Sequence, residues 1–393
     1  MVAWDMGRAW VCIGVLALLA AGCGDDDDAG TRDAAPADAD AADADADAAD
    51  AAPADGASPD VRPDAALFVP GPALLLSDSS PGKDEDPFIL RTRDGRLHVA
   101  WFSERSGNGD IYLRSTSDGQ RFDTPVQVTS GPAVDFFPAL TQGAGDRIHA
   151  AWFRRDTVGS RGRIVYSHTD SITSWPASAE VDVTTPTGSA SDWTPQLAET
   201  AAGALVIVFV RDGCWPQPQP CFGLWATRST TGGATWTPAV QILATAGQQD
   251  HLPSLLASPT GLTLVWNRYD ASATLPWLTT TTDVALATSS DGITWSPGAD
   301  LTSNDTAAIT DVFPALYADH AGALHALWLQ ASTTSMAVVE QRLGAGTPSP
   351  VGDLPAAGYS HHLVATPSPG AFLAAWVAGS GSALDIQVRV IAR

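Results

Sequence analysis

Three arginines at equivalent positions of a repeated pattern are the side chains of this sequence best suited to bind an anion. Each stands two residues after an aromatic that ends an alternating apolar segment: Arg154, Arg211 and Arg268. A guanidinium group binds a carboxylate through two parallel hydrogen bonds, so three such groups on one face would form an anion-binding cleft. The sequence therefore predicts a basic sector that three consecutive repeats contribute.

Aspartates recur in the same repeats and support a second interpretation of these arginines. They begin the copies of an Asp-x-x-Pro pattern: Asp84, Asp135, Asp192, Asp250 and Asp311. Each arginine could pair with a neighbouring aspartate and simply tie the repeats together. A motif shared by equivalent repeats is what structural ion pairs produce, so the pattern favours this alternative over an anion site.

The unit that contains these residues recurs six times. It reads Asp-x-x-Pro, an apolar residue, a glycine-containing turn and an alternating segment that ends in an aromatic. The Pro position is filled by Pro87, Pro138, Pro195, Pro253, Pro314 and, in the sixth copy, His361. Consecutive prolines are 51, 57, 58 and 61 residues apart, and His361 follows 47 residues later. A period of this size made of short strands is typical of radial repeat architectures.

Two further strands are predicted after each aromatic. The third strands are expected at Asp110–Ser115, Arg163–His168, Gly223–Arg228, Asp283–Thr288, Met336–Arg342 and Leu384–Ile391. The fourth strands are expected at Val126–Thr129, Ala179–Val183, Val240–Leu243, Asp300–Thr302 and Val351–Leu354. Six units of four antiparallel strands predict an all-β fold, a six-bladed β-propeller. The sixth unit lacks a fourth strand, and we expect Ala73–Asp78 to supply it and leave no open sheet edge.

The turns between the third and fourth strands carry a second signature. They read S-T-S-D-G-Q-R-F at 115–122, H-T-D-S-I-T-S-W at 168–175, S-T-T-G-G-A-T-W at 229–236 and T-S-S-D-G-I-T-W at 288–295. These turns resemble the Asp-box, or bacterial neuraminidase repeat, of the sialidase-like propellers, over roughly residues 73–393. An Asp or Ser side chain caps the amides of such a turn, and glycine allows a positive φ. The box is therefore interpreted as a marker of the fold and not as a site.

The resemblance implies a glycoside hydrolase as an alternative function. A sialidase holds the carboxylate of its sugar on an arginine cluster and uses a tyrosine activated by a glutamate, with an aspartate as acid/base. Tyr269 and Tyr359 are the candidate tyrosines, and Glu85 and Glu104 lie nearest to them by face. The family's early F/Y-R-I-P motif is missing, because no arginine precedes Pro87. The sequence therefore favours binding over catalysis.

A ligand site is expected at the mouth of the central channel. The loops that enter first strands and leave second strands share this face, so the five repeat aspartates are predicted to form an acidic ring there. Trp215 and Trp277, in variable loops, are expected to contact a ligand, whereas the tryptophans that end second strands belong to the core. The oxygen-rich ring would suit Ca²⁺, but no preformed metal motif accompanies it, so no metal site is predicted.

The first 66 residues predict export and a lipid anchor. Residues 1–22 combine Arg8 with the short apolar segment Val11–Ala21 and end in L-A-A-G-C, which resembles a bacterial lipobox with Cys23 as the lipidated residue. A plain secretory signal is the alternative. Residues 23–66 consist mostly of Asp, Ala and Pro and are predicted to be a disordered acidic tether. The propeller then spans residues 67–393, and only the lipid contacts the membrane.

Two cysteines remain in the exported globular part. Cys214 and Cys221 flank W-P-Q-P-Q-P in one loop, and such a pair forms a disulfide by default in an exported protein. A zinc site would need two further ligands. The formal net charge of −23 argues against nucleic acid as a partner.

These observations predict a monomeric, lipid-anchored protein of the bacterial cell envelope, in the outer membrane and facing the periplasm or the surface. Its propeller is expected to bind a glycan or protein ligand through the channel-mouth face. The alternatives are a divergent sialidase-like glycoside hydrolase that acts on an acidic sugar, and a structural envelope component. Converging Arg, Tyr and Glu side chains would indicate the enzyme. Fully paired arginines without a cleft would indicate the structural component.

Overall fold

The computed structural model describes most of residues 67–393. The described residues are 67–77, 82–157, 159–175, 180–213, 222–244, 246–270, 282–303, 309–332, 335–355, 358–380 and 383–393. The predicted signal peptide, the lipidated Cys23, the acidic tether, the Cys214–Cys221 pair, Trp215 and Trp277 lie outside these ranges. Within them, no helix has the length and apolar character needed to cross a membrane.

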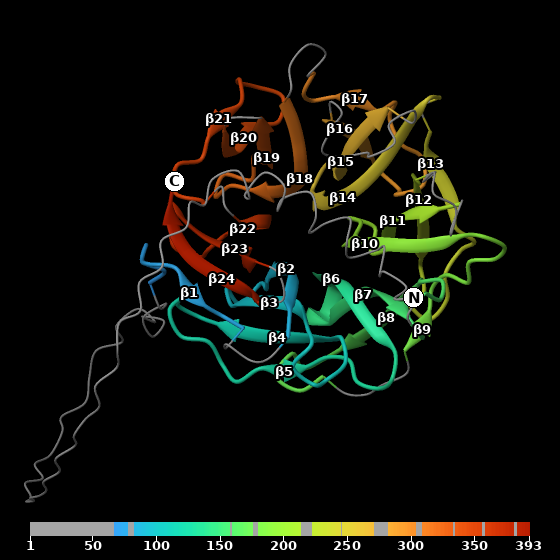
Figure 1. Cartoon of the computed structure of the whole chain (residues 1–393), viewed down its shortest axis with the longest axis horizontal. Coiled ribbons are helices and arrows are strands. Elements are labelled where there is room, and N and C mark those ends of the chain that lie inside the picture. Colours follow the sequence, from blue (N-terminus) through green and yellow to red (C-terminus); the bar gives the residue numbers. More distant parts are fainter. Residues whose placement is uncertain are drawn as a thin grey trace, which may run out of the picture.

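Six four-stranded antiparallel sheets surround a central axis (Figure 1). Blade 1 consists of β2 (Asp84–Arg91), β3 (Leu97–Ser103), β4 (Asp110–Thr116) and β5 (Val126–Gln127). Blade 2 consists of β6 (Val134–Gln142), β7 (Ile148–Arg155), β8 (Arg163–Thr169) and β9 (Val181–Asp182), with a 3-10 turn, η1 (Ala144–Asp146), between β6 and β7. Blade 3 consists of β10 (Ser191–Glu199), β11 (Leu205–Asp212), β12 (Phe222–Ser229) and β13 (Val240–Leu243).

The second half of the ring repeats this plan. Blade 4 consists of β14 (Gln248–Ser258), β15 (Gly261–Asp270), β16 (Thr282–Ser289) and β17 (Ala299–Asp300). Blade 5 consists of β18 (Ile309–Ala318), β19 (Leu324–Ser332), β20 (Met336–Arg342) and β21 (Ser349–Pro350). Blade 6 consists of β22 (Tyr359–Ala365), β23 (Ala371–Ser380), β24 (Ala383–Ala392) and the N-terminal β1 (Leu74–Leu75). The predicted all-β, six-bladed propeller is confirmed.

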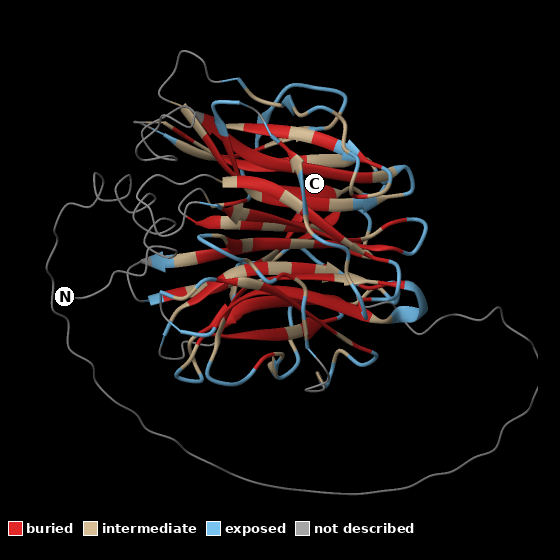
Figure 2. Cartoon of the chain, turned by 90° about the vertical axis from the view of Figure 1, so that its right-hand side faces the viewer, coloured by how far each residue is buried: buried red, intermediate tan, exposed pale blue. Residues whose placement is uncertain are grey.

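The second strands form the packed interior of the ring. All residues of β3 and β7 are buried, because these strands are covered by neighbouring blades on both faces. The aromatics that end the second strands are at most 2 % exposed: Trp101, Trp152, Phe209, Trp266, Trp328 and Trp376. Figure 2 shows the same distribution, with buried strands through the body and exposed residues concentrated in the loops. These large side chains supply much of the apolar area that holds the blades together.

A β-bulge interrupts the first strand of every blade at the Asp-x-x-Pro pattern. The register between first and second strands shifts there in all six blades. The residue before the proline, or before His361, has a positive φ of 43–56°; we call these the bulge residues: Asp86, Phe137, Thr194, Leu252, Phe313 and Ser360. Positive φ is uncommon for residues with a Cβ atom. Because a bulge re-aims the chain locally, this position departs from the alternation of the strand.

The N-terminal segment closes the ring, as the spare strand predicted. Within the expected range Ala73–Asp78, β1 pairs antiparallel with β24, and Figure 1 shows the two strands side by side. The Leu76 amide donates to the carbonyl of Ile386 at 2.8 Å, and the Leu76 carbonyl accepts from Arg114 Nη1 of blade 1 at 2.7 Å. Residues 67–77, the closing segment, therefore join the last blade to the first.

The outer strand of blade 5 differs from the prediction. The sequence pointed to Val351–Leu354, but the strand is Ser349–Pro350. Val351 and Leu354 are each 6 % exposed and pack in the core, and the Val351 amide donates to the carbonyl of Val338 at 2.7 Å. An outer edge strand tolerates proline because its outward N–H has no partner to lose. The apolar residues that suggested a strand instead fill the space behind it.

The box turns are built from their own side chains and pack on the preceding blade. In blade 4, Ser289 Oγ accepts from the amide of Gly292 at 2.9 Å, and Asp291 Oδ1 accepts from the amide of Thr294 at 2.7 Å. Gly292 has a φ of +80°, and a Cβ atom on it would lie 2.3 Å from Val206 of blade 3. The box residues therefore stabilise the turn and allow it to pack against the neighbouring blade.

Candidate functional site

Two of the repeat arginines bind the aspartate of their own blade with both arms of the guanidinium. Arg154 Nε and Nη2 lie 2.7 Å and 2.8 Å from the two carboxylate oxygens of Asp135. Arg211 Nε and Nη2 lie 2.6 Å and 2.8 Å from those of Asp192. Antiparallel pairing places each aspartate directly opposite its arginine. These ion pairs therefore join the first strand to the second within a blade.

The third arginine follows the same arrangement. Arg268 Nε lies 3.2 Å from Asp250 Oδ1, and its guanidinium lies 5.1 Å from the ring centre of Trp266. The indole N–H of Trp266 donates to the same aspartate. Arg154 and Arg211 also lie over the aromatics of their own blades. Each guanidinium is thus held between a carboxylate and a ring, the two groups that bind it best in a protein interior.

In these buried pairs, each group stays charged because its partner offsets the effect of burial on its pKa. Asp135 is 1 % exposed, and this burial raises the pKa of its carboxyl, which the hydrogen bonds from Arg154 oppose. Burial acts to lower the pKa of Arg154, but its hydrogen bonds to Asp135 and Glu180 outweigh that effect and hold the pKa above its usual value. Removal of Arg154 would leave the buried Asp135 carboxylate without this compensating charge.

The aspartate–arginine pair is not kept in the last two blades. Blade 5 keeps Asp311, and Gln330 Nε2 donates to its carboxylate at 3.0 Å in place of an arginine. Blade 6 has Gly358 at the aspartate position and Ala378 at the arginine position, so both charges are absent there. Where the arginine is missing, the aspartate is either bonded by another side chain, as in blade 5, or replaced, as in blade 6, which fits a structural pair.

The predicted acidic ring at the channel mouth does not form. The five repeat aspartates are 0–2 % exposed, and none of them lines the central pocket. Asp84 is representative: it accepts from Trp101 Nε1 at 3.1 Å and lies 3.7 Å from Arg105. The carboxylates turn into their own blades because the hydrogen-bond donors are there. Among the described residues, no three His, Cys, Asp or Glu side chains are grouped to hold a metal ion.

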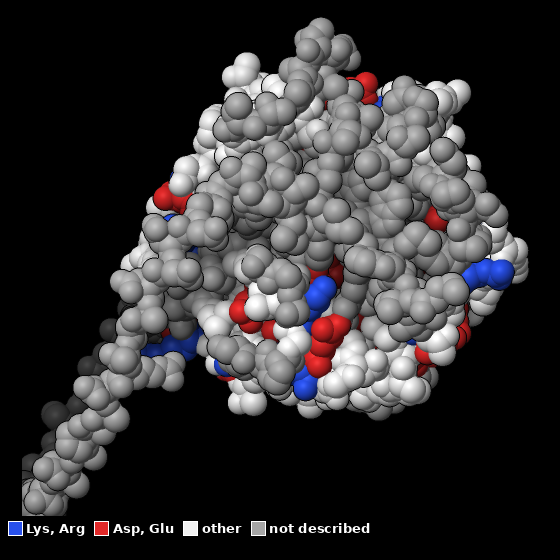
Figure 3. Space-filling view, in the orientation of Figure 1, with Lys and Arg blue, Asp and Glu red and all other residues white. Residues whose placement is uncertain are grey.

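The arginines likewise do not converge on an open cleft. Arg154 and Arg268 are 9 % and 6 % exposed, and each is paired with the aspartate of its own blade. In Figure 3, where described charged side chains are visible, acidic and basic groups alternate over blades 1 and 2, below the centre of the view. This geometry matches the structural interpretation of the arginines and does not bring them together as an anion site.

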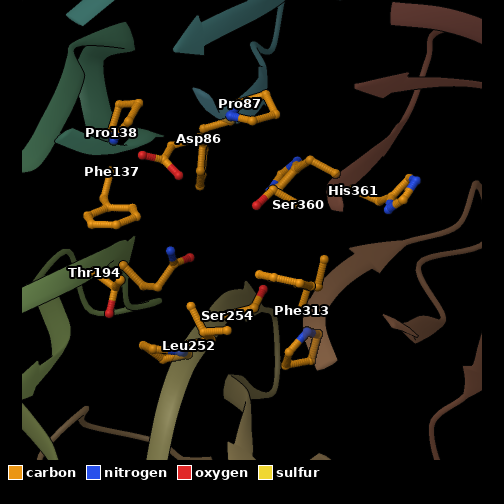
Figure 4. A pocket seen from close by; sticks show the side chains of 16 residues that line it. Asp86, Pro87, Phe137, Pro138, Thr194, Leu252, Ser254, Phe313, Ser360 and His361 are labelled. Carbon is orange, nitrogen blue, oxygen red and sulfur yellow. The ribbon is translucent and has the colours of Figure 1, made fainter. Parts of the chain in front are cut away.

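A pocket lies on the central axis and is built from the six bulges (Figure 4). Its volume is about 110 Å³, and each blade contributes its bulge residue to the lining. A cavity of roughly 150 Å³ holds one benzene-sized ring, so this space suits a single small ring or part of one. Each bulge residue stands two positions further along the first strand than the repeat aspartate. The pocket therefore lies below the channel mouth that the sequence predicted as the site.

The bulge residues form three pairs that face each other across the axis. In a six-fold ring, blades three apart are opposite, and Figure 4 shows the resulting arrangement. The opposed pairs are Phe137 with Phe313, Thr194 with Ser360, and Asp86 with Leu252. The lining thus offers two aromatic walls, the side chains of Thr194 and Ser360, and a carboxylate that faces an apolar side chain. Apolar walls with a few fixed polar groups are typical of small-ligand sites.

The polar side chains of the lining are largely covered. Thr194 is 6 % exposed, and its Oγ1 is fully buried without a hydrogen-bond partner among the described residues, so this oxygen is not presented to the pocket. The histidines are neutral: burial lowers the pKa of His361 and of His362 to about 4. His361 Nε2 lies 2.9 Å from the carbonyl of Pro355, and His362 Nδ1 accepts from the Ile89 amide at 3.3 Å.

The two candidate tyrosines have different surroundings. Tyr359 Oη donates to Glu85 Oε1 at 3.0 Å, and both residues are 6 % exposed. The ring of Tyr359 lies 5.8 Å from that of Phe313, so the Tyr359–Glu85 pair stands directly behind the pocket wall. Tyr269 Oη is 3.5 Å from Gln249, and burial raises the pKa of Tyr269. Of the two candidate tyrosines, Tyr359 is thus the one whose hydroxyl donates to a glutamate.

Sequence reasoning missed the bulge residues. The position before the repeat proline reads Asp, Phe, Thr, Leu, Phe and Ser in successive blades, inside a frame that otherwise repeats. A structural position tends to keep its residue type from blade to blade, as the second-strand aromatics do. Variation inside a repeated frame was therefore the available signal of a position with a different task in each blade.

Comparisons with known proteins establish the fold. No protein-family model matches the sequence, and no curated protein resembles it closely enough to count as a relative. A protein of unknown function from Dyadobacter fermentans matches over 83 % of this chain and 99 % of its own, with 13 % identity and a TM-score of 0.64. The Penicillium chrysogenum α-L-arabinanase complexed with arabinobiose matches over 82 % and 99 %, with 15 % identity and a TM-score of 0.60.

A third solved structure extends the same likeness. The GH93 α-L-arabinofuranosidase of Fusarium graminearum, complexed with arabinobiose, matches over 84 % of this chain and 97 % of its own, with 14 % identity and a TM-score of 0.54. At such identities the likeness shows a shared propeller fold, with neighbours among glycoside hydrolases. The narrower resemblance to sialidases stays a prediction.

Proposed function

We propose that this protein is a lipid-anchored envelope protein whose propeller binds the end of a glycan chain in the axial pocket. The observation that carries the proposal is the pocket lining, in which two opposed phenylalanines stand among the side chains of Thr194, Ser360 and Asp86. Aromatic faces pack against the apolar faces of sugar rings, and hydroxyls and carboxylates bond to sugar hydroxyls. Two propellers of the same fold were solved with arabinobiose bound, which supports a glycan as the ligand class.

The lining favours binding over hydrolysis. Glycoside hydrolases commonly use two carboxyl groups that flank the scissile bond. Among the described residues the pocket lining contains one, Asp86, and the neighbouring Glu85 is instead buried and bonded to Tyr359. The arginines proposed from the sequence to hold an acidic sugar are occupied by their own aspartates.

Truncation of the aromatic walls tests the proposal. Phe137→Ala and Phe313→Ala are each expected to weaken glycan binding by about tenfold or more, because each removes one face of the sandwich around the sugar. The measurement is retention of the full-length protein on an immobilised glycan array, followed by titration of the strongest hits. Phe122→Ala, a phenylalanine of a box turn outside the pocket, is the matched control and should bind as the wild type does. A wild type that retains no glycan, or pocket variants that bind unchanged, would refute the proposal.

One observation favours a second candidate function, a glycoside hydrolase. Tyr359 donates to Glu85 at 3.0 Å beside the pocket, and a glutamate-paired tyrosine is a known alternative to a carboxylate nucleophile. If the chain is an enzyme, Tyr359→Phe is expected to abolish release of the leaving group from aryl glycosides, because phenylalanine lacks the attacking oxygen. The absence of turnover by the wild type on a panel of such glycosides would reject this candidate and leave the binding function intact.

A further inference from the structure

The pocket has a second layer of lining, two residues beyond the bulge residues along the first strands. Five blades contribute a side chain to this layer, and we call them the floor residues: Phe88, Gln196, Ser254, Ala315 and His362. Two floor residues are both polar and half-buried, Gln196 of blade 3 and His362 of blade 6. Blades three apart are opposite in a six-fold ring, so these two side chains line the pocket from opposite sides of the axis.

The ring of His362 is held in place by blade 1. Its Nδ1 accepts a hydrogen bond from the Ile89 amide at 3.3 Å, and the ring centre lies 4.7 Å from that of Phe88. A neutral imidazole that accepts at Nδ1 carries its proton on Nε2. Burial lowers the pKa of His362 to about 4, which keeps the ring neutral at pH 7. The second nitrogen is therefore an N–H donor whose orientation is fixed.

Blade 4 shows that the hydrogen bond to the next blade does not require a histidine. Ser254 occupies the position equivalent to His362, and its hydroxyl oxygen accepts from the Leu316 amide of blade 5 at 3.0 Å. A short side chain that is 7 % exposed is thus sufficient for this contact between blades. The histidine of blade 6 makes the same bond with one nitrogen and carries a second nitrogen that the contact does not use.

The second nitrogen of His362 and the amide oxygen of Gln196 are open to the pocket. Within the described residues, His362 Nε2 has no bonding partner, and it is not among the fully covered polar atoms that lack one. Gln196 Nε2 donates to the carbonyl of Pro195 at 3.1 Å, and its Oε1 is likewise neither covered nor bonded by a described residue. A ligand on the axis thus meets a donor from blade 6 and an acceptor from blade 3.

We infer that His362 Nε2 and Gln196 Oε1 are the specificity-determining groups of the axial pocket, and that they select a neutral terminal sugar over an acidic one. The inference rests on the proposed glycan-binding function and states which glycan ends it concerns. A sugar hydroxyl both donates and accepts, so a neutral ring with hydroxyls on opposite edges can bond to both groups. A carboxylate cannot donate to Gln196, and the described lining holds no lysine or arginine to offset its charge.

Two substitutions separate the two nitrogens of His362. The amide of asparagine can take the place of Nδ1, so His362→Asn keeps an acceptor for the Ile89 amide and loses the donor to the pocket. The longer glutamine reaches the place of Nε2, so His362→Gln keeps the donor and loses the acceptor. A histidine that only joined the blades would show its larger effect in His362→Gln, in stability and in binding alike.

The inference predicts opposite effects of these variants on binding and stability. His362→Asn is expected to weaken binding about tenfold and to leave the melting temperature close to that of the wild type. His362→Gln should bind within about threefold of the wild type and melt roughly 2–4 °C lower, because the Ile89 amide loses its partner. Gln196→Met, which keeps the length of the side chain without its amide, should also weaken binding about tenfold.

Calorimetric titration of the full-length protein provides the measurement. The probes are arabinobiose, xylobiose, α-1,4-galactobiose, α-1,4-digalacturonate and the strongest hit of the glycan array. Galactobiose and digalacturonate differ only at C6, where the latter carries carboxylates. Digalacturonate is expected to bind at least about tenfold more weakly than the tightest neutral probe. His320→Asn is the matched control, because His320 lies outside the lining, 3.1 Å from the carbonyl of Thr366, and it should bind as the wild type does.

The outcomes distinguish the inference from the function on which it rests. If His362→Asn or Gln196→Met binds as the wild type does while Phe313→Ala loses affinity, the two floor residues are not the specificity-determining groups and the glycan site stands. Digalacturonate that binds as tightly as the best neutral probe would overturn the selection of neutral sugars. No binding of any probe, here and on the array, would refute both the inference and the proposed function.

Discussion

Replacement of Arg154 by methionine is expected to lower the free energy of unfolding by about 3–5 kcal/mol at neutral pH, because the loss of one partner leaves the other buried with its charge. Asp135, which is 1 % exposed, would lose both of its hydrogen bonds to the guanidinium. Methionine fills a volume similar to that of arginine, so the change in unfolding free energy reflects the lost charge more than the formation of a cavity. Denaturant titration of wild type and variant gives the difference.

The destabilisation should depend on pH. Burial already raises the pKa of Asp135, and the loss of Arg154 would raise it further. A carboxyl whose pKa is higher in the folded than in the unfolded protein destabilises the fold once it ionises, so its cost appears as the pH rises above the unfolded value of about 3.9. The difference between variant and wild type is therefore expected to be largest near pH 7 and to shrink as the pH falls toward 4. An equal difference at both pH values would show that the variant perturbs packing instead.

Two further variants serve as controls for this result. Arg147→Met removes an arginine whose ion pair with Asp170 is exposed, at 39 % and 73 % of the two side chains, and should cost less than about 1 kcal/mol. The double variant Asp135→Leu with Arg154→Met replaces both charges by apolar groups and is expected to recover most of the lost stability. Blade 6, with Gly358 and Ala378 at these positions, already folds without the pair.

Much of the fold is predictable from the sequence because its strongest constraints repeat. An aromatic residue must fill the space between blades in each of the six repeats. The sequence therefore shows aromatics and turns at a regular spacing. The fourth strand of blade 5 was misplaced because it is two residues long at an exposed edge. Which residues pair with the third strand depends on how the neighbouring apolar residues pack behind it, and the strand itself has no apolar pattern that marks it in the sequence.

The candidate site was less accessible to the same reasoning. The pairing of arginine with aspartate could be proposed because both residues recur at fixed positions. The pocket could not, because its lining depends on a positive φ at the bulge residues, and residues before proline have no local tendency toward that conformation. The bulge exists because the blades pack around a shared axis, so its effect on side-chain direction appears only in the assembled ring.

The closing segment is the other place where a single change should have a large effect. Phe68 and Leu76 are 3 % and 1 % exposed and belong to the apolar cluster that joins blades 6 and 1. β1 also covers the outer edge of β24, and Phe68 is held by a hydrogen bond of 2.9 Å from its amide to Ser368 Oγ. The segment thus supplies core side chains and the last strand of the ring together.

Deletion of Leu67–Ser79 is therefore expected to lower the free energy of unfolding by about 5 kcal/mol, since buried phenylalanine and leucine side chains alone account for several kcal/mol. It should also expose the edge of β24 and promote association between copies of the chain, because an uncovered strand edge can pair with another strand. Thermal unfolding and size-exclusion chromatography of the full-length protein measure the two effects. Deletion of residues 40–52, the same length taken from the acidic segment, is the control and should change neither. If the shortened ring forms too little folded protein to measure, Leu76→Ala, with an expected loss of about 3 kcal/mol, tests the same contact. An unchanged melting temperature in both variants would mean that the ring is held closed by blade packing alone.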